Sequence, residues 1–228
     1  MTRNKIKFSH TKWLPLWILL IGSIVLYMIA HAVQQDDSRH IRTLAELNAV
    51  TYGDNMIADL NAGINITDTL EQLLISTDGR IDKFDIIADR MMADYVRSIQ
   101  VAPGGIVTDI YPAEGNEAGK IDLIHDKYRG ETVNYSIAND VLIIHGPFEL
   151  EQGGHVLSIR NPVFLQDEKG TPYFWGMTMV IIKVPDIFQH SADALTNFGY
   201  QYRLSKTISP LTDEYTVVDQ SEETLMDP

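Results

Sequence analysis

Two features of the sequence could bind a metal or a phosphate: three histidines and one glycine-rich segment. His125, His145 and His155 lie ten and twenty residues apart, without the three- or four-residue spacing that brings two ligands to a metal on a helix. Residues 115–120 (GNEAGK) have one residue too few between the glycines for a phosphate-binding loop, and Ile121 replaces its Ser or Thr. The chain has no cysteine and no G-x-S-x-G. We therefore expect no catalytic residue, no metal ligand and no cofactor, and predict that this chain is not an enzyme.

Charge is distributed very unevenly along the chain. The formal net charge is −13, with 18 basic and 31 acidic side chains among 228 residues. Residues 1–12 carry +4 and residues 13–33 carry none, so residues 34–228 hold 14 basic and 31 acidic side chains, which is −17. A body of that sign repels phosphate backbones, and the sequence excludes nucleic acid as a partner.

The uncharged segment 13–33 has the properties of a membrane anchor. Its 21 residues span ~31 Å as a helix at about 1.5 Å per residue, close to the hydrocarbon thickness of a bilayer. Trp13 and Tyr27 lie toward its two ends, as in an aromatic belt. We predict a transmembrane helix, with residues 1–12 as a basic cytoplasmic tail and residues 34–228 outside the cytoplasm. Ala30-His31-Ala32 leaves a cleaved leader open as an alternative.

The hydrophobic pattern changes from helical to strand-like near residue 98. Apolar residues recur at threes and fours over 34–64, Asp68-x-x-Glu71 has the form of a capping box, and another helix is expected at about 82–97. Residues 34–97 are therefore predicted to form a helical stalk. About five strands follow within 98–184, and a helix and two further strands within 185–228. Helices followed by hairpin-linked strands indicate an α+β fold.

Several short sequence words occur in a fixed order between residues 111 and 176. They are Tyr111-Pro112, Gly115-Asn116-Glu117, Gly119, Gly146-Pro147-Phe148-x-Leu150, Gly153-Gly154, Arg160-x-Pro162-Val163-Phe164 and Phe174-Trp175-Gly176. In this order behind an N-terminal anchor, they resemble the CHASE domain, the extracytoplasmic sensory module of membrane histidine kinases and diguanylate cyclases. The resemblance covers about residues 40–205.

The resemblance implies a fold and an assembly. A long helix would lead into two PAS-like antiparallel-sheet subdomains, a membrane-distal one at 98–184 and the start of a membrane-proximal one at 185–228. The resemblance leaves open whether the second sheet is complete. Such domains usually form dimers and hold a small-molecule ligand in the membrane-distal sheet. The sequence also leaves open whether the chain is a fragment of a longer receptor or a short protein that binds without its own output.

The resemblance also implies positions for ligand contacts. Plant cytokinin receptors of this family bind an adenine-type ligand through an aspartate and a strand backbone, which correspond to Asp122 and Ile144. Arg160 and Gly154 fall at further pocket positions. Because a buried guanidinium needs an anionic partner, Arg160 either pairs with an acid such as Asp122 or Glu149, or meets a carboxylate or phosphate of the ligand.

Two functions follow as the main hypotheses, and a third, a secreted or periplasmic hydrolase, stays open only because metal-free carboxylate sites can hide in a sequence. The first is a small-molecule-sensing domain of a membrane receptor, which passes binding to an output domain through helices. The alternative is a membrane-tethered interaction or adaptor protein that uses the same sheet as a scaffold without a ligand.

Overall fold

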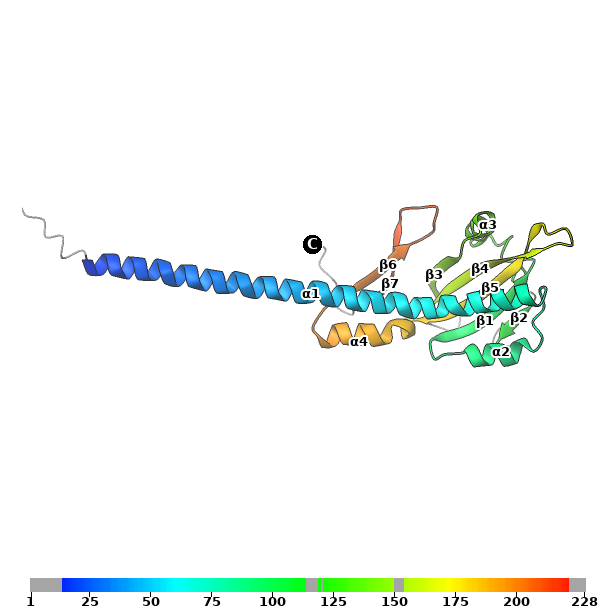
Figure 1. The fold of residues 1–228 in the computed structure, drawn as a ribbon, viewed down its shortest axis with the longest axis horizontal. Helices are drawn as coiled ribbons and strands as arrows, with labels where there is room; N and C mark the ends of the chain where they lie inside the picture. The colour runs from blue at the N-terminus through cyan, green and yellow to red at the C-terminus, as the bar shows by residue number, and fades with distance from the viewer. Residues whose placement is uncertain (1–13, 114–118, 120, 150–153, 222–228) are drawn as a thin grey trace, which may run out of the picture. The chain divides into compact units, whose positions relative to one another are not determined.

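A computed structural model describes residues 14–113, 119, 121–149 and 154–221 (Figure 1). The motif residues Gly115-Asn116-Glu117, Leu150 and Gly153 lie outside this described part. The backbone forms two compact units, one ending at Val50 and the other beginning at Thr51.

The first unit consists of the N-terminal part of helix α1 (Leu14–Ser76). An 18-residue window of this helix has a mean hydropathy of 2.2, and none of the window is buried. Its length and composition allow it to cross a membrane, so the predicted helix is present and its membrane span remains a prediction. Pro15 lies in the first turn, where its missing N–H interrupts no helical hydrogen bond.

Helix α1 continues without a break into the second unit. The capping-box pattern Asp68-x-x-Glu71 predicted a helix start at Asp68, and this prediction is wrong, because α1 is helical through Ser76. Tertiary packing outweighs this local signal: Leu70 is 0% exposed and Leu74 is 1% exposed against the sheet. The short helix α2 (Phe84–Met91) ends earlier than the predicted 82–97, since Met92 has an extended backbone that leads into the first strand.

The main sheet has five antiparallel strands in the order β2-β1-β5-β4-β3. Its strands are β1 (Val96–Pro103), β2 (Asp109–Tyr111), β3 (Ile143–Glu149), β4 (His155–Gln166) and β5 (Pro172–Val184). Helix α3 (Gly130–Asn139) precedes β3. The predicted α+β fold with an antiparallel sheet is confirmed.

The chain after the main sheet forms a smaller structure. It comprises η2 (Asp186–Phe188), α4 (Gln189–Asn197), β6 (Arg203–Thr207) and β7 (Tyr215–Gln220). Within the described residues, β6 and β7 form a separate two-stranded antiparallel sheet. That this hairpin begins a second PAS-like subdomain remains a prediction.

The two faces of the main sheet are covered by different elements. On one face, Ile99, Ile159 and Ile182 pack with the C-terminal part of α1 and with α2. On the other face, Met177 and Met179 pack with Val133 of α3 and with the segment around Leu123. Because neighbouring residues of a strand point to opposite faces, each strand supplies side chains to both layers.

The Phe-Trp-Gly word has two separate packing roles. A side chain on Gly176 would collide with the backbone carbonyl of Ala102, so this glycine allows β1 and β5 to approach. The Trp175 ring lies against Gly79, just after α1, where an added Cβ would meet the indole ring.

We predict that Gly79→Ala destabilises the protein more than Gly170→Ala does. Both glycines have φ of +78°, so an alanine at either position costs ~1–2 kcal/mol of backbone strain. Only Gly79 has the Trp175 ring in the way, which adds about 1–3 kcal/mol, whereas nothing lies within 4 Å at Gly170. Urea unfolding of both variants measures the difference. Equal losses would contradict the packing role of Gly79.

Candidate functional site

Strand register brings several polar side chains onto the sheet face opposite α1. Residues aligned across antiparallel strands share a face, which gives two adjacent rows. The rows are Ser98–Ile181–Ser158–His145 and Gln100–Met179–Arg160–Ile143. We call their five polar members the polar floor: Ser98, Gln100, His145, Ser158 and Arg160. The floor spans three strands, β1, β4 and β3, with the apolar side chains of β5 between them.

Four of the five polar-floor residues are buried, His145 is half-buried, and not every polar atom of the floor has a hydrogen-bond partner. Arg160 is 2% exposed and donates from Nε to Ser158 Oγ at 3.1 Å. Gln100 donates from Nε2 to Ser98 Oγ at 2.9 Å. The Nη1 atom of Arg160 has no hydrogen-bond partner among the described residues. A buried charged donor without an acceptor is costly, so this atom marks a place where an acceptor is needed.

Burial also changes the titration of Arg160. Desolvation, followed by the charge of Arg129, lowers the pKa of Arg160 to about 10, while Asp126 acts in the opposite direction. The guanidinium therefore stays protonated at neutral pH. Asp126 is the acid whose charge acts on it.

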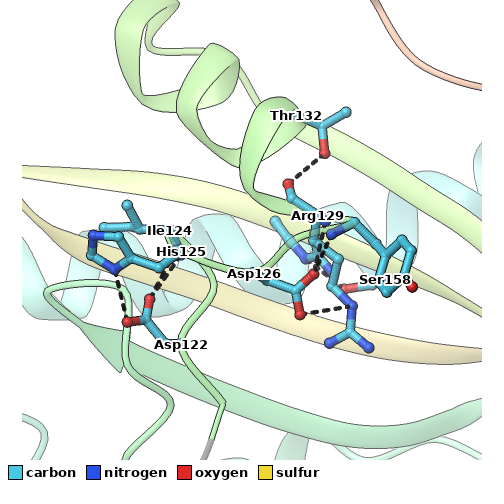
Figure 2. Close-up of polar contacts among 9 residues, drawn as sticks. Asp122, Ile124, His125, Asp126, Arg129, Thr132 and Ser158 are labelled. Atoms are coloured by element: carbon cyan, nitrogen blue, oxygen red, sulfur yellow. Dashed lines mark hydrogen bonds and ion pairs between the residues drawn. The ribbon is translucent and has the colours of Figure 1, made fainter.

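The turn before α3 carries a charged pair, Asp126 and Arg129 (Figure 2). Asp126 Oδ1 accepts hydrogen bonds from the backbone N–H groups of Tyr128 at 2.8 Å and Arg129 at 2.9 Å. Its Oδ2 lies 3.9 Å from Nε of Arg129. Burial raises the pKa of Asp126, but these hydrogen bonds and the charge of Arg129 outweigh it, and the net pKa is lowered. Asp126 is thus ionised and engaged with its own turn.

His145 lies within the electrostatic reach of these charges. Burial and the positive charges of Arg160, Arg129 and Lys206 lower the pKa of His145 to about 4, and Asp126 acts in the opposite direction. Its ring centroid is 5.8 Å from that of Phe148. At neutral pH His145 is therefore uncharged.

The depressed pKa of His145 predicts a pH-dependent loss of stability. The unfolded chain binds a proton at His145 near pH 6.5 and the folded chain only near pH 4, so the free energy of unfolding falls as pH drops through this window. We expect His145→Gln to flatten that part of the stability profile, measured by urea unfolding between pH 7 and 4. His155→Gln, at an exposed position, is the control. An unchanged profile in His145→Gln would contradict the assignment.

Burial varies along this sheet face. Met177 and Met179 of β5 are 0% and 1% exposed beneath the apolar cluster at α3. Two residues further along the same central strand, Ile181 is only partly buried, as is His145 in the same row. The two serines of that row, Ser98 and Ser158, are 1% and 0% exposed.

Asp122, predicted as a ligand contact, forms hydrogen bonds within its own turn (Figure 2). Its Oδ1 accepts from the backbone N–H groups of Ile124 and His125, both at 3.1 Å, and its Oδ2 lies 2.8 Å from His125 Nδ1. The backbone N–H of His125, followed by its ring, lowers the pKa of Asp122. Among the described residues Arg160 contacts neither Asp122 nor Glu149, the two acids named as its possible partners.

The other predicted contacts lie apart from Arg160. Ile144 pairs with Ile159 and so faces the α1 side of the sheet. There it lines a pocket of about 400 Å³ together with apolar residues of β4, η2 and the β6–β7 hairpin, and with Lys206. Gly154 precedes β4 with φ of +90° and no atom within 4 Å of an added Cβ. The ligand roles of Asp122, Ile144, Arg160 and Gly154 remain predictions, and of these four Arg160 alone lies in the polar floor.

The sequence reasoning missed the neighbours of Arg160. A signal was present: one apolar residue, Ile99, separates Ser98 from Gln100, and Ile159 likewise separates Ser158 from Arg160. Polar residues at every second position of such a strand lie on one face. Asp126 and Arg129 gave no such signal, because their place over the sheet depends on tertiary structure.

Comparisons with known proteins bear on the fold. No family model matches the chain, and no curated protein matches it. Among solved structures, an extracellular ligand-binding receptor from Desulfohalobium retbaense DSM5692 aligns with a TM-score of 0.50 at 15% identity, covering 64% of this chain. The chain spans about a quarter (26%) of that receptor. The fold is thus similar to an extracellular ligand-binding receptor domain.

A second solved structure is the ligand-binding domain of the Pseudomonas aeruginosa PAO1 amino acid chemoreceptor PctC in complex with GABA. It has a TM-score of 0.48 and 17% identity, with coverage of 73% of this chain and 70% of that one.

Proposed function

We propose that this chain is the extracytoplasmic, small-molecule-sensing CHASE domain of a membrane receptor of the histidine kinase or diguanylate cyclase type. The observation that carries the proposal is the buried Arg160, whose Nη1 lacks an acceptor among the described residues. The ordered sequence words and the likeness in fold to an extracellular ligand-binding receptor support it. A ligand at the polar floor would supply the missing acceptor.

Strand β4 connects the proposed ligand site to the long helix. Arg160 belongs to the polar floor, and the next residue, Asn161, points to the opposite face of the sheet. There Asn161 Nδ2 donates to Glu71 Oε2 of α1 at 2.8 Å and lies 3.4 Å from Asp68 Oδ1. A ligand that binds one arrangement of β4 more tightly than another would shift the hydrogen bonds at α1, and only such a difference in affinity can transmit a signal.

A ligand screen tests the sensing function directly. The full chain in detergent is heated with amino acids, organic acids, nucleobases and sugars, and unfolding is followed by tryptophan fluorescence. We expect at least one class to raise the melting temperature in a saturable way, because a ligand that binds only the folded state stabilises it. Arg160→Met should reduce that shift. A screen in which no solute raises the melting temperature would contradict the sensing function.

The proposed topology places residues 13–33 in the membrane, residues 1–12 in the cytoplasm and residues 34–228 outside. The chain has no cysteine, so single cysteines report location without background. A membrane-impermeant thiol reagent applied to intact cells should label Glu168→Cys, at an exposed position of the β4–β5 connection, but not Lys5→Cys. Labelling of Lys5→Cys would reverse the topology.

A homodimer through the helical stalk is part of the same proposal. Leu47 and Val50 are 60% and 61% exposed on α1, and a second copy of the helix would cover them. We expect Leu47→Cys to form a disulfide-linked dimer under mild oxidation, whereas Glu168→Cys should not. The absence of a crosslink at position 47 and at neighbouring helix positions would contradict a stalk dimer.

One observation favours the alternative of a membrane-tethered interaction protein. Large apolar side chains are exposed on and beside the β6–β7 hairpin, namely Phe198, Ile208, Leu211, Tyr215 and Val217. Such a group is typical of a surface that binds another protein. Under this alternative, polar substitutions at Tyr215 and Val217 would abolish function in cells, while Arg160→Met would leave it unchanged.

A further inference from the structure

The unpartnered donor of Arg160 indicates the charge of the ligand. Its guanidinium is protonated at neutral pH, 2% exposed, and bonded through Nε to Ser158. Nη1 has no acceptor among the described residues. A buried cation in this state is stabilised most by an anion with oxygen acceptors, because such hydrogen bonds are charge-assisted.

The other charges of the site leave Arg160 uncompensated. The Arg129 charge is met by Asp126, whose Oδ2 lies 3.9 Å from Arg129 Nε, and Asp126 Oδ1 accepts two backbone N–H groups. His145 is neutral at pH 7. Among the described residues, Arg160 therefore has no ion pair of its own, inside a chain whose net charge is −13. A positive site in an acidic protein selects anions by its local arrangement rather than by the overall field.

The geometry points to a small carboxylate as the chemical group that this site binds, with its oxygen accepting a hydrogen bond from Arg160 Nη1. This inference rests on the proposed sensing function and narrows its ligand class. One buried guanidinium with one unpartnered donor nitrogen matches a monovalent carboxylate, whereas a phosphate dianion would bring a second negative charge to the same guanidinium.

Binding of a carboxylate should be coupled to protonation of His145. The charged groups that act on this ring are Arg160 of β4, Arg129 before α3, Lys206 of β6 and Asp126. An anion at Arg160 offsets the positive charges that disfavour the imidazolium, so the bound state takes up a proton more easily than the free state. Affinity for the carboxylate then rises as the pH falls from 6.5 to 4.5, toward the pKa of about 4 that His145 has in the free protein.

Formate, formamide and inorganic phosphate are the probes for the first experiment. The full chain in detergent is titrated with each at constant ionic strength, and dissociation constants are taken from the rise in melting temperature. We expect formate to bind and formamide, its uncharged analogue, not to bind. Arg160→Met should weaken formate binding at least tenfold, whereas Arg90→Met, the same change at an exposed position of α2, should leave it unchanged.

Three results would overturn the inference. They are equal binding of formate and formamide, equal binding of formate by the wild-type protein and Arg160→Met, and tighter Arg160-dependent binding of phosphate than of formate. If neutral or cationic solutes stabilise the protein in the broad screen, the sensing function is still supported. Failure of the carboxylate inference can therefore be distinguished from failure of the sensing function.

The second experiment measures formate binding as a function of pH and needs no substitution at Arg160. In the wild-type protein the dissociation constant for formate should fall between pH 6.5 and 4.5, and His145→Gln should remove most of this dependence. If Arg160→Met does not fold, this experiment decides alone. A formate affinity that does not change with pH in the wild-type protein would overturn the inference.

Discussion

Leu70→Ala should lower the free energy of unfolding by about 2–5 kcal/mol, as expected for truncation of a fully buried leucine. Leu70 is 0% exposed in α1, where it belongs to the core that joins this helix to the sheet. The loss combines the transfer free energy of the removed methyl groups with the cost of the cavity they leave. Urea unfolding of the full chain in detergent, followed by tryptophan fluorescence, measures it.

The matched control is Leu211→Ala, the same truncation at a position that is 50% exposed. It should change the free energy of unfolding by less than about 0.5 kcal/mol. If Leu70→Ala were as mild as this control, the C-terminal part of α1 would not be part of the domain core. That result would also remove the route from β4 to the helix.

Asn161→Asp should be the most damaging of the polar substitutions. Asn161 is 9% exposed and donates to Glu71 at 2.8 Å. An aspartate there would lose the donor and place a third carboxylate beside Glu71 and Asp68, at a cost of about 3 kcal/mol at neutral pH. Burial already raises the pKa of Glu71, and the hydrogen bond from Asn161 opposes that rise.

The variant should recover as the pH falls. A carboxylate with a raised pKa in the folded state contributes stability that is present at low pH and is lost as the pH rises through that pKa. The difference in unfolding free energy between wild type and Asn161→Asp should therefore shrink between pH 7 and 4.5. Asn139→Asp, at an exposed position of α3, serves as the control and should show only a small, nearly constant difference. A loss at Asn161 that does not depend on pH would contradict the carboxylate cluster.

The strands of the main sheet were predictable because their signals are local. Alternating and continuous apolar runs flanked by Gly, Pro and Asn locate β1, β3, β4 and β5 to within a few residues. The course of α1 was less predictable. Gly53 and the pair Asp68 and Glu71 have local preferences for a break, but burial of Leu70 and Leu74 and the contact with Asn161 hold the helix together.

The candidate site was only partly predictable. Arg160 could be singled out because an arginine inside an apolar strand needs a partner. Its surroundings depend on which strands become neighbours, and the order β1-β5-β4-β3 cannot be obtained from hydrophobic periodicity. Asp122 illustrates the limit: a resemblance gives a position in the chain, but the turn around His125 decides where the carboxylate lies and what it binds.

The edge strand β3 has a consequence for solubility. Its pairing with β4 shifts register between His145 and Phe148, across Gly146-Pro147. A proline has no N–H to offer to an incoming strand, and an irregular edge does not match a straight one. The outer side of β3 is thus a poor template for strand addition from other copies of the chain. This edge therefore protects the sheet, whose strands are long and apolar, from aggregation at high protein concentration.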